Sequence, residues 1–305
     1  MEKLVLFCKS YSNDMLMARR MAESVYRFNS DSILLYISVP ERDLEDFKRC
    51  FNGIPCIFIT DEETLKISAQ TNGPLPKLFP PHLIQQLIKL EFWRNNFSEN
   101  YAWIDSDSYF IRPFFLTDFL PTADAIGPYT VQEEFIVKNE LEKFHYIPEK
   151  KRIKWITGLE AIIIKFRALF NNQGPLYYFA GSTPVIWSCK VLKHLNDNYL
   201  KQHQKNIYEL LHDFPCETQL YGEYLHYSKV IPIVPIDHMF KSFYHAENFY
   251  HSQIMGECEY SLAKDYLGIC IQSNWARLDK PRNQVQRLKK HLDEFKRSLG
   301  LLKFD

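Results

Sequence analysis

The first sixty residues alternate between short apolar segments and longer amphipathic segments, and this alternation restricts the fold more than any other feature of the sequence. The apolar segments at 4–8, 33–39 and 54–60 are predicted to be β-strands, and the segments at 14–28 and 41–51 are predicted to be helices. Strands that are connected through helices pair in parallel, because a parallel connection needs a long crossover. The sequence therefore predicts an α/β fold in which helices flank a mostly parallel sheet.

Polar side chains follow the first and third of these strands. Lys9 and Ser10 come directly after the first strand, and Asp61 comes directly after the third. Ligands of open parallel sheets bind at the carboxyl ends of the strands. We therefore expect Lys9, Ser10 and Asp61 to lie at a ligand-binding edge of the sheet.

The rest of the chain is less regular. Further predicted elements are a helix at 82–95 that Pro80 and Pro81 open, a strand before Asp105, strands at 159–166 and 268–273, and helices at 185–195 and 217–226. The segment at 124–154 is polar and shows no clear pattern. Because no repeat and no linker interrupts the chain, residues 1–275 are predicted to form a single domain.

Two aspartates end the strand that follows the 82–95 helix. Asp105 and Asp107 are two residues apart, so in an extended segment they point to the same face. Neighbouring carboxylates repel each other, and a divalent cation such as Mg²⁺ or Mn²⁺ removes that conflict. The alternative is a purely structural role, in which the two aspartates at a strand-to-turn junction accept hydrogen bonds from local backbone amides. A calcium loop of the EF-hand type is excluded, because Phe110 replaces the required glycine and Leu116 the terminal glutamate.

Composition excludes several classes of protein. The chain has 37 Lys and Arg against 37 Asp and Glu, and this balance argues against a nucleic-acid partner. Seven scattered cysteines without a CxxC pair argue against a zinc ribbon or a disulfide framework. The sequence has no run of 18 apolar residues, and we expect a cytoplasmic protein. Aromatic residues make up 15%, which suits sugar or base stacking as well as ordinary core packing.

The helix PPHLIQQLIKLEFW followed by the strand AWIDSDSYFIRPF resembles nucleotide-sugar glycosyltransferases of the GT-A type. Within them it is most similar to a bacterial group of polysaccharide-biosynthesis enzymes. The resemblance implies a nucleotide-binding half at 1–120 and an acceptor-binding half at 121–275. It also implies a nucleotide-sugar donor, most commonly with UDP, a Mn²⁺ or Mg²⁺ cofactor, and a glycan or lipid-linked glycan as acceptor.

Carried over residue by residue, the resemblance implies specific roles. Asp107 would be the principal metal ligand, and Asp105 would touch the metal or the ribose. His245 would be a third ligand of the metal. The alternative is that it is a core or surface histidine that binds no metal. The remaining donor contacts would come from Lys9 and Ser10 beside the base, Asp61 at the base or ribose, and Gln86 and Lys89 at the nucleotide or its phosphates. For Gln86 and Lys89, an exposed helix face is an equally good interpretation.

Sugar transfer with inversion also needs a base for the acceptor hydroxyl and positive charge on the leaving diphosphate. The resemblance implies that Glu217 at the start of the 217–226 helix is that base, with Glu223, expected near the substrate, as the alternative base. A glutamate in a first helical turn is also common for dipole reasons. Lys241 is expected to neutralise the leaving phosphate. Tyr178 and Trp187 are expected to stack on the acceptor sugar, with core packing as the alternative for Trp187.

The segment 276–305 is predicted to be a basic amphipathic helix. Its apolar stripe would pack on the domain itself, or it would rest on an anionic membrane surface near a lipid-linked acceptor. Two other functions stay open from the sequence. One is nucleotidyl or sugar-phosphate transfer on the same fold, and the other is carbohydrate binding without catalysis.

Overall fold

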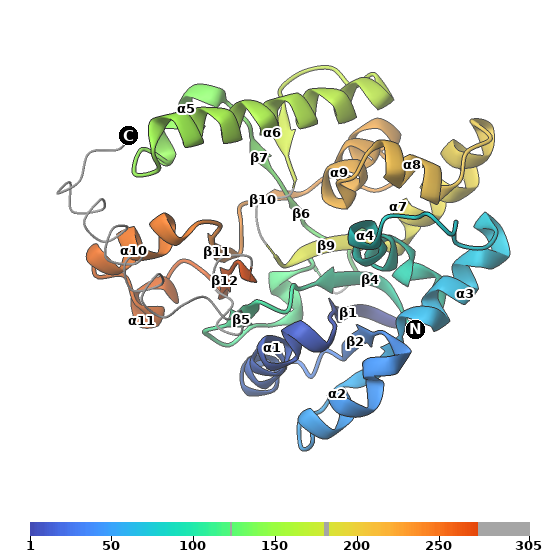
Figure 1. Cartoon of the computed structure of the whole chain (residues 1–305), viewed down its shortest axis with the longest axis horizontal. Coiled ribbons are helices and arrows are strands. Elements are labelled where there is room, and N and C mark those ends of the chain that lie inside the picture. Colours follow the sequence, from blue (N-terminus) through green and yellow to red (C-terminus); the bar gives the residue numbers. More distant parts are fainter. Residues whose placement is uncertain (123, 180–182, 274–305) are drawn as a thin grey trace.

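The computed structural model describes residues 1–122, 124–179 and 183–273, and its centre is a five-stranded sheet (Figure 1). The strand order is β3-β2-β1-β4-β9, and all neighbours are parallel except β9, which runs antiparallel to β4 at one edge. The strands are β1 (Glu2–Lys9), β2 (Leu35–Val39), β3 (Ile57–Thr60), β4 (Ser98–Trp103) and β9 (Val185–Ser188). The predicted α/β fold with a mostly parallel sheet is confirmed.

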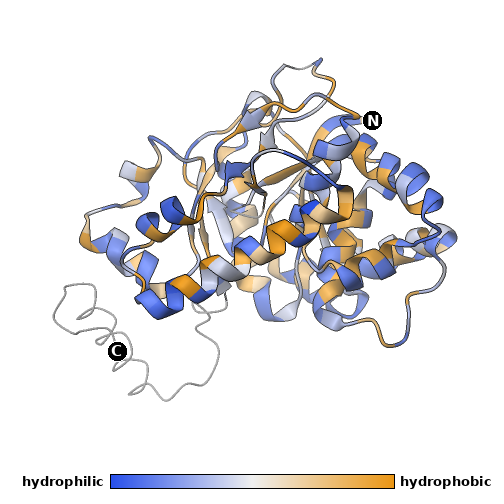
Figure 2. Ribbon diagram, turned by 90° about the horizontal axis from the view of Figure 1, so that it is seen from above, coloured by the Kyte–Doolittle hydropathy of each residue, from blue (hydrophilic) through white to orange (hydrophobic). Residues whose placement is uncertain are grey.

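The alternation of side chains along the central strand β1 divides the core into two layers. Leu4, Leu6 and Cys8 point to one face, where they pack with α1 (Met15–Phe28) and α2 (Leu44–Cys50). Val5 and Phe7 point to the opposite face. Both sets are almost fully buried, which explains why the strand reads as a continuous apolar run rather than as an alternating one. Figure 2 shows the same distribution, with hydrophobic segments inside and hydrophilic segments around them.

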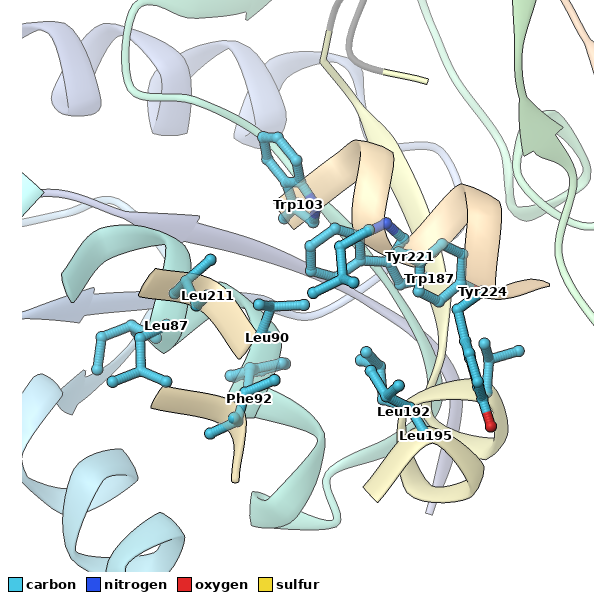
Figure 3. Packing of buried hydrophobic residues seen from close by; sticks show 14 of the residues in the cluster. Leu87, Leu90, Phe92, Trp103, Trp187, Leu192, Leu195, Leu211, Tyr221 and Tyr224 are labelled. Atoms are coloured by element: carbon cyan, nitrogen blue, oxygen red, sulfur yellow. The ribbon is translucent and has the colours of Figure 1, made fainter. Parts of the chain in front are cut away.

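The second layer is built from helices of both halves of the chain. They are α3 (Asp61–Asn72), α4 (Pro81–Glu91), α7 (Cys189–His194), α8 (Ile207–Asp213) and α9 (Glu217–Ser228). Figure 3 shows how Leu87 and Leu90 of α4 lie near Leu211 of α8 and how Trp187 of β9 lies beside Tyr221 of α9. This packing fixes the starts of α4 and α9 relative to the sheet, and both helices contribute to the site described below.

The second half adds a smaller sheet and an outer layer of helices. The small sheet has the order β11-β12-β5, with β11 (Phe240–Phe243), β12 (Gly268–Ile271) and β5 (Ser108–Phe110). Two short ribbons pair β6 (Thr130–Val131) with β10 (Pro235–Ile236), and β7 (Glu133–Glu134) with β8 (Tyr177–Tyr178). The outer helices are α5 (Val137–Lys143), α6 (Glu149–Phe170), α10 (Ala246–Ile254) and α11 (Glu259–Leu262).

Two predictions for the second half are wrong. The run at 159–166 is not a strand but the interior of the 22-residue helix α6. Ile156, Ile163 and Phe166 bury one side of this helix, whereas Ile162 and Ile164 are exposed, and a short apolar run does not reveal such a choice by its periodicity alone. The segment at 185–195 is not one helix, because its first four residues form β9, which pairs with β4, and only then does α7 begin.

The segment at 124–154, for which the sequence shows no pattern, contains the short strands β6 and β7, helix α5 and the first turns of α6. Strands of two residues are too short to produce a periodic pattern. The basic helix predicted at 276–305 lies outside the described residues. Within the part of the chain that the structure describes, none of the helices combines the length and the hydrophobicity that crossing a membrane requires.

Candidate functional site

The carboxyl ends of β1, β2 and β3 meet at a buried ion pair. The Lys9 ammonium lies 2.9 Å from Asp61 Oδ2, and the Ser38 hydroxyl donates to Asp61 Oδ1 at 2.7 Å. Burial raises the pKa of Asp61, and Lys9 opposes that effect. Ser10, which follows Lys9 in the chain, is also buried. Its hydroxyl oxygen has no hydrogen-bond partner among the described residues. The structure therefore brings Lys9 and Asp61 together at the edge where the sequence predicts a ligand.

The acidic pair lies where the chain leaves the large sheet for the small one. β4 ends at Trp103 and β5 begins at Ser108, so Asp105 and Asp107 occupy the crossing between the two sheets. Asp107 is buried and held by β12 and the residues after it, because the Cys270 thiol of β12 contacts its Oδ1 at 3.6 Å and the Ser273 backbone amide donates to its Oδ2 at 2.8 Å. Asp105 is more open, with 37% of its side chain exposed.

Lys89 connects this acidic pair to a residue far away in the sequence. Its ammonium lies 2.9 Å from Asp105 Oδ1 and 3.3 Å from Glu217 Oε1. It also lies 3.6 Å from the ring centroid of Trp103, which is a favourable cation–π contact. Burial acts to lower the pKa of Lys89, but the two carboxylates outweigh it and raise the pKa, so the side chain is a cation. Lys89 is therefore not part of an exposed helix face.

Glu217 is the first residue of α9, and its carboxylate is buried against Lys89. A carboxylate in the first turn of a helix is stabilised by the amides that the helix leaves unpaired there. The neighbouring Thr218 lines a small pocket of about 50 Å³ together with Trp103, Asp105 and Thr183. Lys89, Asp105 and Glu217 lie up to 128 residues apart in the chain but meet at one site, where the cation lies between the two carboxylates.

The donor atoms of this site fit a divalent cation. Among the described residues, no Lys, Arg or His side chain lies within 4 Å of Asp107, and its burial together with the charge of Asp105 raises its pKa to about 6. A buried carboxylate without a cationic partner is costly, and a bound metal ion supplies the missing charge. Asp105 and Asp107 would hold such an ion, with oxygen ligands of the kind that Mg²⁺ and Mn²⁺ prefer.

The expected third ligand, His245, does not join this pair. Within residues 1–122, 124–179 and 183–273, no three Asp, Glu, His or Cys side chains are grouped closely enough to hold a metal ion. His245 instead precedes α10 as its N-cap residue and packs edge-on against Trp155, with ring centroids 5.1 Å apart. Its burial lowers its pKa. Its position at a helix start could not be foreseen, because α10 has no strong sequence signature.

Two expected acceptor contacts are core residues. Trp187 is fully buried in β9 and stacks on Tyr221 at 5.2 Å, so its ring offers no face to a sugar. Glu223 is 1% exposed, and its carboxylate accepts hydrogen bonds from Asn172 and Gln219 at 2.7 and 3.3 Å. The bond from Asn172 fastens α9 to the segment after α6. Both corrections have one cause, because a sequence does not show which face of an element its neighbours cover.

The other expected residues lie at two places. Lys241 and Tyr178 line a cavity of about 420 Å³ in the second half, where Lys241 forms an ion pair with Glu257 at 3.6 Å. Gln86 is half-buried on α4, one turn before Lys89, and its side-chain oxygen has no hydrogen-bond partner in the described part of the chain. Gln86 therefore has an unused acceptor on the helix that supplies Lys89.

Two residues of the site escaped the sequence analysis. Trp103 lies under the Lys89 ammonium, and Ser38 binds Asp61. Each had a recognisable position, since Trp103 lies two residues before Asp105 and so shares its face in an extended segment. Ser38 is the polar residue near the end of the otherwise apolar strand β2. Polar or aromatic residues near the ends of predicted parallel strands are therefore candidates for site residues.

We expect the Lys89→Met variant to be about 3 kcal/mol less stable, because removing one member of a buried ion pair leaves the others uncompensated. This value is at the lower end of the usual range, since Asp105 is 37% exposed. Urea unfolding at pH 7 measures the loss. Lys3→Met is the matched control, because Lys3 pairs with Glu99 on the same sheet but both side chains are at least 40% exposed. Equal effects of the two substitutions would contradict a buried charge network.

Comparisons with known proteins give one family and a fold likeness. The sequence profile of a family of unknown function (DUF6492) matches residues 4–255, a span that runs from β1 to α10. No curated protein matches the chain. Among solved structures, mouse xyloside xylosyltransferase 1 in its apo form is similar at 11% sequence identity, with a TM-score of 0.47 over 89% of this chain and 98% of that chain.

Proposed function

We propose that this chain, which belongs to the family of unknown function DUF6492, is a metal-dependent glycosyltransferase that uses a nucleotide-sugar donor. One observation carries the proposal: the carboxyl edge of the parallel sheet holds Asp105 and Asp107 next to a buried cation, Lys89, and a second acid, Glu217. A carboxylate pair for a metal, a cation and a base are the groups that transfer from a diphosphate requires. The donor nucleotide is expected to be UDP, and the acceptor a growing bacterial glycan.

The nucleoside would lie over the ends of β1 and β3. Lys9, Ser10 and Asp61 are the polar groups at that edge, and Asp61 is already oriented by Lys9 and Ser38. A carboxylate fixed in this way accepts hydrogen bonds from ribose hydroxyls or from a base N–H without further ordering cost. The Asp61 carboxylate is therefore oriented for the nucleoside before the donor binds.

The diphosphate would lie between the acidic pair and the start of α4. When bound, a Mg²⁺ or Mn²⁺ ion held by Asp105 and Asp107 supplies positive charge to the leaving diphosphate. Lys89 is poised to shift from Asp105 towards the phosphates, because its ammonium already lies between two carboxylates and above Trp103. Gln86, one turn away on the same helix, has a buried side-chain oxygen without a hydrogen-bond partner in the described part of the chain, and its side chain would turn to reach the nucleotide.

Glu217 would accept the proton of the attacking hydroxyl. Its carboxylate lies in the first turn of α9 and 3.3 Å from the Lys89 ammonium, so it is held at the same site as Asp105. A base opposite the leaving group corresponds to inversion at the anomeric carbon. Lys241 would assist the departing phosphate after release from Glu257, 3.6 Å away.

Two other functions are compatible with parts of this site. Nucleotidyl or sugar-phosphate transfer would use the same acidic pair, and carbohydrate binding without catalysis would use the aromatic cavity around Tyr178. They differ in what they bind. Only an enzyme that uses an activated donor needs a nucleotide together with a metal ion.

We expect UDP or a UDP-sugar to stabilise the protein against thermal unfolding only when Mn²⁺ is present. At a hundredfold excess over its dissociation constant, a ligand that binds only the folded state adds about 2.7 kcal/mol. Differential scanning fluorimetry with Mn²⁺, with EDTA, and with neutral sugars alone measures this. Stabilisation that persists in EDTA would contradict the metal site. Stabilisation by free sugars but by no nucleotide would favour the carbohydrate-binding alternative.

A further inference from the structure

The outward side of helix α6 is exposed over most of its length, and the proposed transfer reaction does not use it. The helix runs along the periphery of the molecule (Figure 1) and packs inward on α5 and α9. Between residues 150 and 168, its exposed residues are four lysines, three isoleucines and four small residues, and none of them is acidic. These residues form the outer face of α6. Of the two acids in the helix, Glu149 lies in the first turn, before the outer face, and Glu160 is half-buried.

A basic stripe and an apolar stripe run side by side along the outer face. Lys150 and Lys154 are four residues apart and Lys165 follows eleven residues later, so the three lie on one line of the helix. Ile153 and Ile164 are also eleven residues apart and lie on the neighbouring line. These two isoleucines remain 44% and 51% exposed. A surface helix normally keeps such side chains on the side that faces the core, so α6 has apolar residues on a side where polar ones are expected.

The positive charge of the outer face is only partly neutralised by its neighbours. Lys150 and Lys154 form no ion pair with any residue that the structure describes. Lys151 forms an ion pair at 2.9 Å with a glutamate of α10, but its side chain stays 47% exposed. Lys165 donates to the backbone oxygen of Asp213, and an uncharged carbonyl does not cancel its charge. The outer face therefore presents lysines that lack counter-charges.

Charge and shape restrict what can cover this face. A second copy that used the same face would bring lysines against lysines. The segment 276–305 carries nine Lys and Arg against four Asp and Glu, so it would be repelled as well. A protein partner needs pockets for its anchoring side chains, whereas the outer side of a single helix is convex. A membrane with anionic lipids attracts lysines, and its interface takes up exposed isoleucines without requiring a matching shape.

We propose that the outer face of α6 rests on a membrane surface that contains anionic lipids. The lysines would lie at the level of the lipid head groups, and Ile153 and Ile164 would reach the boundary with the acyl chains. On the opposite side of α6, Trp155 and Leu159 line the cavity of about 420 Å³. The membrane would therefore lie about one helix diameter, roughly 10–12 Å, from this cavity. The inference goes beyond the proposed function and does not depend on it.

Co-sedimentation of the full chain with lipid vesicles tests this proposal. The probes are vesicles of phosphatidylcholine alone and vesicles in which about a third of the lipid is phosphatidylserine. We expect binding to the anionic vesicles only, and release by added salt, because salt screens the attraction. The Lys150→Gln/Lys154→Gln variant should bind the anionic vesicles about thirtyfold more weakly, since each lysine near an anionic surface contributes about fivefold to the affinity.

Lys190→Gln/Lys205→Gln is the matched control. Lys190 and Lys205 are exposed, lie outside α6 and form no ion pair among the described residues, and their substitution changes the net charge by the same amount. We expect this variant to bind like the unaltered chain. Both variants retain the segment 276–305, so a difference between them belongs to α6.

Three results would overturn the proposal. They are no binding of the unaltered chain to the anionic vesicles, unchanged binding of the α6 variant, and an equal loss in both variants, which would make net charge the cause. Binding to soluble polyglutamate but not to vesicles would also overturn it and would assign the outer face to an acidic protein. The measurement needs no donor, so a failure here leaves the Mn²⁺-linked nucleotide binding as an independent result.

Discussion

Replacing Asp107 with asparagine should lower glycosyl transfer by roughly 10³-fold or more. The expectation follows from the position of Asp107 as the buried carboxylate that lacks a cationic partner, since loss of a catalytic metal removes several kcal/mol of charge stabilisation. The amide keeps an oxygen that accepts from the Ser273 backbone, so the local fold should persist. Transfer assays with a UDP-sugar and Mn²⁺ measure the loss.

The same variant has a distinctive signature in stability. Removing a buried, unpaired charge should leave the apo protein as stable as before or more stable, whereas the stabilisation by nucleotide and Mn²⁺ should disappear. Asp265→Asn is the matched control, because Asp265 is exposed between α11 and β12. Full activity of the Asp107 variant, or undiminished activity of the unaltered enzyme in EDTA, would remove the metal from the mechanism.

Glu217→Gln is expected to reduce turnover by roughly 10²–10⁴-fold while donor affinity changes little. A glutamine keeps an oxygen towards Lys89 but does not accept the acceptor proton at neutral pH. Measurement of kcat together with donor binding by calorimetry separates the two effects. A base acts on the acceptor, so its loss should appear in the chemical step.

Glu209→Gln provides the comparison for this experiment, because Glu209 is also in the first turn of a helix but is exposed and far from the acidic pair in the sequence. We expect unchanged turnover for it. A parallel loss of donor binding in the Glu217 variant would instead assign this residue to the support of Lys89. In that case the proton would be taken by another group, and the mechanism would have to be revised.

The Lys89 network couples Glu217 to Asp105, the other acid of the pair. Asp105 and Glu217 share one ammonium, so a change in either carboxylate alters the position of the cation for the other. Effects of substitutions at residues that share a partner do not add. The Asp105→Asn and Glu217→Gln changes are therefore best combined in a double-mutant cycle, which isolates their coupling through Lys89.

Several features of this protein were accessible from the sequence alone. The parallel sheet, its strands in the first sixty residues and the position of Asp105 and Asp107 at a strand end follow from local patterns, because strand and helix periodicities and turn residues act within a few neighbours. The same holds for Lys9 and Asp61, since the end of a parallel strand defines the edge on which they lie. Glu217 was located by the start of its helix.

Other features were decided only by the tertiary structure. Whether Lys89 faces solvent or the acidic pair depends on how α4 packs on the sheet, and the burial of Trp187 depends on the pairing of β9 with β4. The apolar run at 159–166 became helix rather than strand because α6 covers α5 and α9 instead of joining a sheet. Contacts between residues a hundred or more positions apart depend on the packing of whole elements. A single sequence carries no local pattern for them, and for that reason the ion pair between Lys89 and Glu217 appeared only in the folded chain.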